Sequence, residues 1–130
     1  MSTSLAIGTS ATRYFDLAEL QELRDHLGCD AAQSLFDTFV CELPRYRSAI
    51  EAATAKRDFA TLARIVHTLR GTALSFSCTG LAPLCESLKT QCERGDVDTC
   101  RSSAAALAFA YVCALAELQS LRAPGGLLAA

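Results

Sequence analysis

The chain has 130 residues, of which 51% are apolar and 20% are charged, and its formal net charge is −2. This length fits one domain with one hydrophobic core. We expect no nucleic-acid partner because the chain has no basic run, and no membrane association because no uncharged, strongly apolar stretch reaches about 18 residues.

The two ends of the chain differ from its middle. Residues 1–13 are small, polar and aperiodic, and they predict a flexible N-terminal tail. A helical domain is expected over residues 14–122, followed by a flexible C-terminal tail over 123–130. The start lacks the charged front and apolar block of a signal peptide, so we expect a cytoplasmic protein.

Two helices are predicted in the first part of the domain. Asp16 can cap a short helix with a leucine stripe that ends at Gly28. Asp30 can cap a second helix over about 31–55. Pro44 lies inside that second pattern, where it should bend the helix or mark a local break.

Three more helices follow at short intervals. Their predicted ranges are 58–77, 80–94 and 97–121. Asp58 is the expected cap of the first of these helices, and Asp96 or Asp98 that of the third. The second is expected to have Thr79 as its cap, Pro83 in its first turn and Gly95 at its end. No strand pattern is present, so the fold class is all-α. Short turns favour an antiparallel, up-down four-helix bundle, with the first short helix packed across one end.

The chain contains seven cysteines, an odd number, and nothing in it points to secretion, so disulfides are not expected. Cys78, Cys85 and Cys92 repeat every seven residues, which raises the alternative of a helical metal protein. However, no C-x-x-C pair exists and no histidine lies at zinc-ligand spacing among them. We interpret these thiols as small core side chains and expect no metal site.

The helix over 58–77 carries the most informative pattern. Its apolar residues recur every three or four positions and form one stripe that should face the core: Phe59, Leu62, Val66, Leu69, Ala73 and Phe76. His67 follows Val66 and is therefore turned about 100° away from the stripe. The pattern predicts that His67 faces outward with Ala63, Arg64, Arg70 and Gly71 as neighbours.

Gly71 lies four residues after His67 and shares its face of the helix. A glycine inside a helix costs about 1 kcal/mol relative to alanine. A glycine at this place leaves space beside the imidazole for a phosphoryl group or another protein. A helix kink or a close helix crossing is the alternative explanation.

The segment His67-Thr68-Leu69-Arg70-Gly71-Thr72-Ala73 resembles the signature of histidine phosphotransfer (HPt) domains, which is His-x-Leu-Lys-Gly-small-small. The resemblance extends over about residues 14–122 through Phe76, the Leu84-Cys85-Glu86-Ser87-Leu88 segment and the turn at Arg94-Gly95-Asp96. Three positions depart from the family pattern. The family's lysine is Arg70, its usual glycine after the apolar position is Ser77, and its frequent glutamate or glutamine after the Leu-Cys-x-x-Leu segment is Lys89.

The resemblance implies a phosphorelay carrier, with His67 as phosphoacceptor between aspartates of a hybrid histidine kinase receiver domain and a response regulator receiver domain. An imidazole is mostly a neutral base at neutral pH and can attack an acyl phosphate. Arg70, Arg64 and Lys89 are placed to offset the phosphate charge, and Gly71, Thr72 and Ala63 are expected to leave clearance for docking.

Several expectations accompany this interpretation. We expect no kinase activity and no cofactor, with Mg²⁺ supplied by the partner receiver domain, and we expect a monomer. A non-relaying adaptor that binds or sequesters a receiver or kinase domain through the same face is the alternative function. His26 lies in the last turn of its predicted helix, where a cation is favoured, and it lacks a glycine or arginine setting as a second phosphoacceptor.

Overall fold

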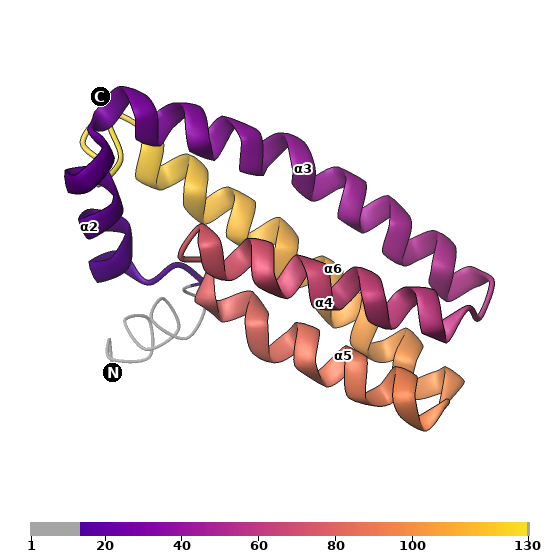
Figure 1. Ribbon diagram of the computed structural model, residues 1–130. Helices are drawn as coiled ribbons and strands as arrows, with labels where there is room; N and C mark the ends of the chain where they lie inside the picture. The colour runs from indigo at the N-terminus through magenta and orange to yellow at the C-terminus, as the bar shows by residue number, and fades with distance from the viewer. Residues whose placement is uncertain (1–13, 130) are drawn as a thin grey trace, which may run out of the picture.

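A computed structural model of the protein describes residues 14–129, and this part of the chain is helical without strands. Its helices are α2 (Leu17–Leu27), α3 (Cys29–Ala55), α4 (Phe59–Ser75), α5 (Ala82–Arg94) and α6 (Val97–Arg122), with a short 3-10 helix, η1 (Thr79–Leu81), before α5. The predicted all-α class and the helical bundle are confirmed. In Figure 1 the four longer helices lie side by side and α2 lies at one end. The predicted N-terminal tail lies outside the described residues.

Three helices begin at the aspartates that the sequence predicts as caps. In each case the carboxylate accepts a hydrogen bond from the backbone N–H three residues later, at 3.1 Å: Asp16 from Glu19, Asp58 from Thr61, and Asp96 from Thr99. Such a bond satisfies one of the amide groups that a helix start leaves without a partner. The starts of α2, α4 and α6 are therefore encoded locally.

Two other predicted caps are wrong. Helix α3 begins at Cys29, so Asp30 lies in its first turn, and no side chain caps it. The reason is that Gly28, with a φ of 87°, ends α2 and leads directly into α3, which leaves no separate cap residue. Thr79 lies in η1, and α5 starts after Leu81 without a side-chain cap. Pro83 in the first turn of α5 and Gly95 at its end agree with the prediction.

Helix α3 continues through Pro44 as one element of 27 residues. A local break, one of the two outcomes expected at Pro44, is therefore absent. Pro44 is exposed. Inside a helix, a proline leaves one backbone hydrogen bond unmade and its ring crowds the carbonyl of the preceding turn. The remaining turns of α3 are stabilised by burying Phe36, Phe39 and Leu43.

The core lies between α3, α4, α5 and α6. Contacts join α3 to α4, α4 to α5, α5 to α6 and α6 to α3, while α2 packs against α3. Phe39 and Phe76 stack with ring centroids 4.4 Å apart, and Phe36 meets the edge of Phe76 at 5.7 Å. Aromatic pairs in these arrangements add to the stabilisation from burial. This packing fixes the core side of α4.

The connection between α4 and α5 is held by the segment before α2. Asp16 N donates to Ser77 O at 2.9 Å, and Gly80 N donates to Tyr14 O at 2.8 Å. A Cβ atom on Gly80 would lie 2.7 Å from the Tyr14 Cα, so only glycine permits this approach. The short N-terminal helix is thereby tied to the end of the bundle.

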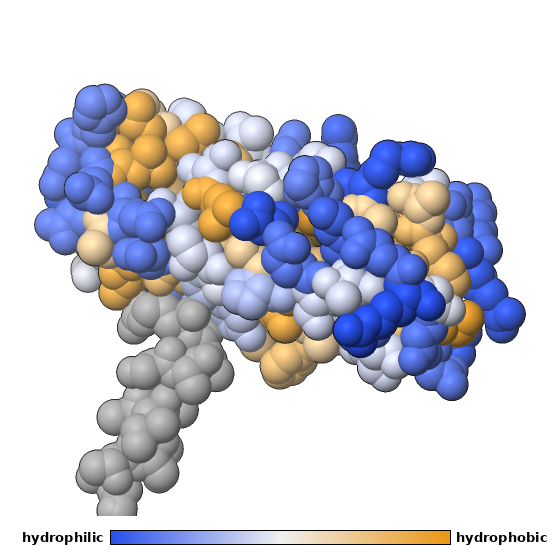
Figure 2. Space-filling view, turned by 60° about the horizontal axis from the view of Figure 1, so that its bottom comes forward, coloured by the Kyte–Doolittle hydropathy of each residue, from blue (hydrophilic) through white to orange (hydrophobic). Residues whose placement is uncertain are grey.

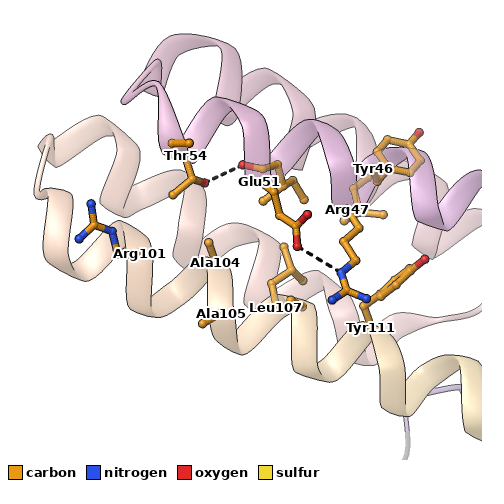
Figure 3. A pocket seen from close by; sticks show the side chains of 13 residues that line it. Tyr46, Arg47, Glu51, Thr54, Arg101, Ala104, Ala105, Leu107 and Tyr111 are labelled. Atoms are coloured by element: carbon orange, nitrogen blue, oxygen red, sulfur yellow. Dashed lines mark hydrogen bonds and ion pairs between the residues drawn. The ribbon is translucent and has the colours of Figure 1, made fainter.

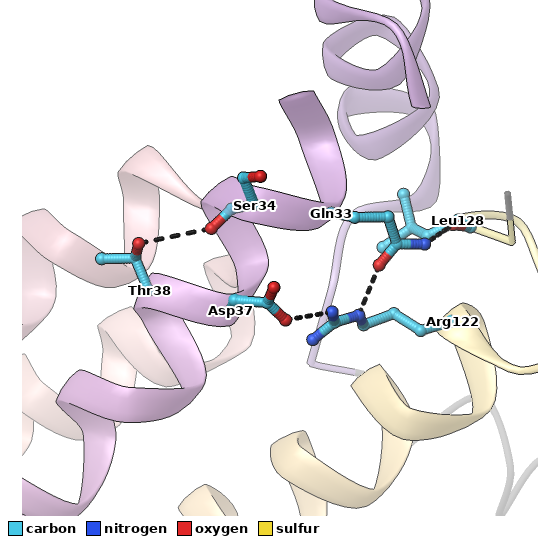
Figure 4. Close-up of polar contacts among 6 residues, drawn as sticks. All are labelled: Gln33, Ser34, Asp37, Thr38, Arg122 and Leu128. Atoms are coloured by element: carbon cyan, nitrogen blue, oxygen red, sulfur yellow. Dashed lines mark hydrogen bonds and ion pairs between the residues drawn. The ribbon is translucent and has the colours of Figure 1, made fainter. Parts of the chain in front are cut away.

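The residues after α6 fold back onto the bundle, which differs from the flexible tail that the sequence predicts. Leu128 is 2% exposed, and its N–H donates to Leu121 O at 2.7 Å. Gln33 links both segments, since its amide nitrogen donates to Leu128 O and its Oε1 accepts from Arg122 Nε at 2.7 Å (Figure 4). Arg122 also pairs with Asp37. Residues 123–129 therefore cover the junction of α2 and α3.

Helix α6 is long and apolar enough to cross a membrane by length and composition alone. Its core positions are occupied by Cys100, Leu107, Ala110, Tyr111, Ala114 and Leu118, which are buried within the bundle. Phe109 and Val112 on its outer side are 69% and 48% exposed. Over the face shown in Figure 2, hydrophobic residues form separate patches among hydrophilic ones.

Candidate functional site

His67 is exposed on the outer side of α4, as the periodicity predicts. The stripe that sets this orientation is buried, with Leu62, Val66 and Ala73 at 0% exposure and Leu69 at 2%. A residue that follows Val66 must then lie well away from the core. The side chain is therefore accessible to a reaction partner and plays no part in packing the bundle.

Gly71 is exposed one turn after His67, and a Cβ atom added there would meet no heavy atom within 4 Å. Packing within the described part of the chain therefore does not require a glycine at this position, and the helix-crossing explanation has no contact to support it. Ala63 is half-buried and Arg64 is exposed one turn before His67. Small side chains thus leave open surface on both sides of the imidazole.

Arg70 points toward α5, where its Nε lies 2.6 Å from the Oε2 atom of Glu86. The two side chains are 38% and 48% exposed, and the Arg70 Nε makes no aligned hydrogen bond despite this distance. The contact is an ion pair in which part of the guanidinium remains available. Glu86 was not predicted as a site residue, because the sequence alone does not show which residue of α5 faces Arg70.

The Arg70–Glu86 pair also fixes the level of Lys89. The two helices form a hairpin, so a step of three residues back from Arg70 and a step of three residues forward from Glu86 reach the same height. Those steps lead to His67 on α4 and to Lys89 on α5. Lys89 is half-buried and has no hydrogen bond or ion pair within residues 14–129.

Arg64 and Thr72 have other local partners. Arg64 donates to the Thr61 hydroxyl at 3.3 Å and makes no ion pair with another residue of the described chain. Hydrogen bonds from Thr61, assisted by the positive charge of Arg64, lower the pKa of Asp58. Thr72 is half-buried, and its hydroxyl lies 2.9 Å from the Tyr46 hydroxyl of α3. Thr72 therefore joins α4 to α3, a contact that the sequence did not reveal.

The cysteines are free thiols, and Cys78, Cys85 and Cys92 are buried in the core, as predicted. Burial raises the pKa of Cys85 and of Cys92 to about 12 in each case. Residues 14–129 contain no group of three or more histidine, cysteine, aspartate or glutamate side chains that could hold a metal ion. His26 is exposed in the last turn of α2.

A family model for the Hpt domain matches residues 34–123, which include His67 and most of the bundle. The chain belongs to the Hpt domain family. Comparisons with curated proteins and with solved structures give no match. Hpt domains act in phosphotransfer within two-component phosphorelays, and they interact with receiver domains of kinases and response regulators. The exposed histidine of α4 therefore lies in a domain of a phosphotransfer family.

Proposed function

We propose that this Hpt domain relays a phosphoryl group between an aspartate of a hybrid histidine kinase receiver domain and an aspartate of a response regulator receiver domain. His67 is the phosphoacceptor. The observation that carries this proposal is the exposure of His67 on α4, off the buried stripe and beside the open surface at Gly71. A core histidine could not be reached by a second protein.

The transfer exchanges one bond to phosphorus for another. A neutral imidazole nitrogen of His67 attacks the phosphorus of the aspartyl phosphate in line, the N–P bond forms, and the P–O bond to the aspartate breaks. The electron pair of the broken bond leaves with the aspartate carboxylate. The reverse sequence passes the group to the next receiver. Because such transfers depend mainly on positioning and charge stabilisation, a carrier needs little chemistry of its own.

Arg70, Lys89 and Arg64 are the cations that we propose to offset the phosphate charge. A phosphorylated side chain carries about −1.5 to −2 charges. Exposed ion pairs contribute only about 0–1 kcal/mol each, so these cations orient and hold the group more than they drive its transfer. Gly71, Thr72 and Ala63 keep the surface around His67 low enough for a receiver domain to dock.

We further propose that the domain is a cytoplasmic, monomeric carrier without kinase activity, and that Mg²⁺ is supplied by the receiver domain. The proposed scaffold is an antiparallel, up-down arrangement of α3 to α6 with α2 across one end. Short connections and the ring of contacts from α3 through α6 support it. Such a scaffold holds α4 rigidly while leaving its outer side accessible.

The decisive experiment is phosphotransfer from a panel of labelled receiver domains to the wild-type protein and to His67→Ala, resolved on gels run without acid. We expect acid-labile, alkali-stable label on the wild type and none on His67→Ala, whose helicity should be unchanged. Label on a folded His67→Ala variant would refute the role of His67. Binding to receiver domains without any label would instead favour the non-relaying adaptor.

A further inference from the structure

A groove of about 520 Å³ lies between α3 and α6 (Figure 3), and His67 is not among the residues that line it. Its lining is mainly apolar and includes Ile50 of α3, Leu69 of α4 and Leu107 of α6. The α6 side of the groove carries the small side chains of Ala104 and Ala108, which do not fill the space between the helices. This volume falls within the range of about 300–1,000 Å³ that is usual for small-molecule sites, which are also mostly apolar with a few polar groups.

Polar groups lie at both ends of the groove, and the carboxylate of Glu51 lies between them. Arg101 and Thr54 are at one end, and Arg47 and Tyr111 are at the other (Figure 3). Arg47 is already paired, because its Nε lies 3.3 Å from Glu51 Oε2. Arg101 has no hydrogen bond or ion pair with any residue of the range 14–129. The groove therefore has one uncompensated cationic end.

Tyr111 adds a second unpartnered group. The residue is 5% exposed, and its hydroxyl has no hydrogen-bond partner among the residues that the structure describes. The hydroxyl oxygen is not one of the side-chain atoms closed off from solvent, so it meets water at this end of the groove. Burial of the ring raises the pKa of this phenol, with an opposing effect of Arg47, so the hydroxyl remains a donor at neutral pH.

We propose that this groove binds an amphipathic carboxylate with an unbranched apolar chain. The carboxylate pairs with Arg101, and the chain lies over Ile50, Leu69 and Leu107. The ten residue-to-residue steps from Arg101 to Tyr111 correspond to about 15 Å along α6, which sets the length of chain that the groove can cover. A fully apolar ligand would leave the Arg101 guanidinium without a partner. A short acid would leave the apolar surface of Ile50, Leu69 and Leu107 exposed to water.

Chain length and charge give the proposal its test. Binding of octanoate, decanoate and dodecanoate to the full chain is measured by calorimetry below their micelle concentrations. Each added CH₂ should tighten binding by about fourfold until the groove is covered, following the usual gain on burying a methylene. Dodecanol, which has the same chain without the charge, should bind about tenfold more weakly, and Arg101→Ala should lose a similar factor for dodecanoate.

Two further variants separate the groove from general surface binding. Ala108→Phe fills the groove and should abolish dodecanoate binding, with circular dichroism to verify the fold. Arg45→Ala removes an exposed arginine of α3 that does not line this groove, and it should bind normally. If Ala108→Phe does not fold, the loss of dodecanoate affinity in Arg101→Ala still tests the proposal. The proposal would be overturned if Arg101→Ala bound dodecanoate as tightly as the wild type, if dodecanol bound as tightly as dodecanoate, or if no saturable binding were found.

Discussion

Arg70 and Glu86 join α4 to α5 at one turn from His67, with 2.6 Å between the guanidinium Nε and the carboxylate Oε2. Arg70 is also the cation that we propose for phosphate support. In the unphosphorylated domain, the Glu86 carboxylate therefore pairs with the same guanidinium that the phosphoryl group would contact. Phosphate carries about twice the charge of a carboxylate, so the two compete for one arginine.

This competition predicts that Glu86→Gln prolongs the life of phospho-His67 or shifts transfer toward it. The expected gain is up to about fivefold, the factor that corresponds to the 0–1 kcal/mol of an exposed pair. Arg70→Ala should shorten that lifetime or slow transfer. The measurement is the decay of label on purified phosphorylated protein, with Glu93→Gln as a control on an exposed glutamate of the same helix.

A double variant tests whether the effect of Glu86 passes through Arg70. In the Arg70→Ala background, Glu86→Gln should have a smaller effect than in the wild type, because only the direct repulsion between Glu86 and phosphate remains. Equal lifetimes for wild type, Glu86→Gln and Arg70→Ala would mean that Arg70 is a solvated charge without a role at the site.

Substitutions at Gly71 should affect receiver docking and the stability of the domain differently. Gly71→Ala meets no neighbour and should stabilise the domain by about 0.4–1 kcal/mol, through higher helix propensity and a less flexible unfolded chain. Gly71→Gln should also fold, but its long side chain would stand beside His67 and slow receiver phosphotransfer by about tenfold or more, because transfer depends on close positioning.

Thermal unfolding and single-turnover transfer measure the two effects of these Gly71 variants. The alanine variant serves as the control, since it changes the backbone propensity without filling the space. Normal transfer kinetics in a folded Gly71→Gln variant would contradict the clearance argument and leave the glycine without an assigned function.

Local sequence signals predicted what depends on local structure. The spacing of Leu62, Val66 and Leu69 was enough to orient His67, because helix geometry alone sets that angle. Asp58 was recognised as a cap for the same reason. Asp30 was misassigned because Gly28 serves both α2 and α3, a backbone conformation that composition does not reveal.

Contacts between distant segments were not predictable in this way. Glu86 became visible as a partner of Arg70 only when the register of α4 against α5 was known. The sequence predicts that Leu128 belongs to a tail after Pro124 and two glycines, yet Leu128 packs into the core. Arg24 and Gln33 bind the carbonyls of the returning segment. Both cases depend on tertiary packing, which periodicity does not encode.

Thiol reactivity should follow burial. Burial raises the pKa of Cys85 to about 12, so at pH 8 this group is a protonated and enclosed thiol, whereas Cys41 is exposed. Because the thiolate is the reactive form, iodoacetamide should label Cys41 rapidly and leave Cys85 and Cys92 unlabelled until urea unfolds the protein. Mass spectrometry of peptides reads this out. Labelling of Cys85 as fast as Cys41 in the native protein would contradict its place in the core.

Ser77 offers a gain in stability at the position where the family pattern has glycine. Its φ is 62°, in the left-handed region, and the residue is 6% exposed. This conformation costs a residue with a Cβ about 1–2 kcal/mol of conformational free energy. For glycine the main cost is its greater freedom in the unfolded chain. Ser77→Gly should therefore raise the free energy of unfolding by about 0.5–1 kcal/mol, measured by urea denaturation.

Two matched variants show whether backbone conformation explains the gain at Ser77. Arg57 has a φ of 55° on the exposed turn before α4, so Arg57→Gly should change stability in the same direction. Ser77→Ala keeps the Cβ and should bring no gain. A Ser77→Gly variant that is less stable than the wild type would mean that the serine side chain contributes more than its backbone conformation costs, and that the departure from the family's glycine is compensated within this loop.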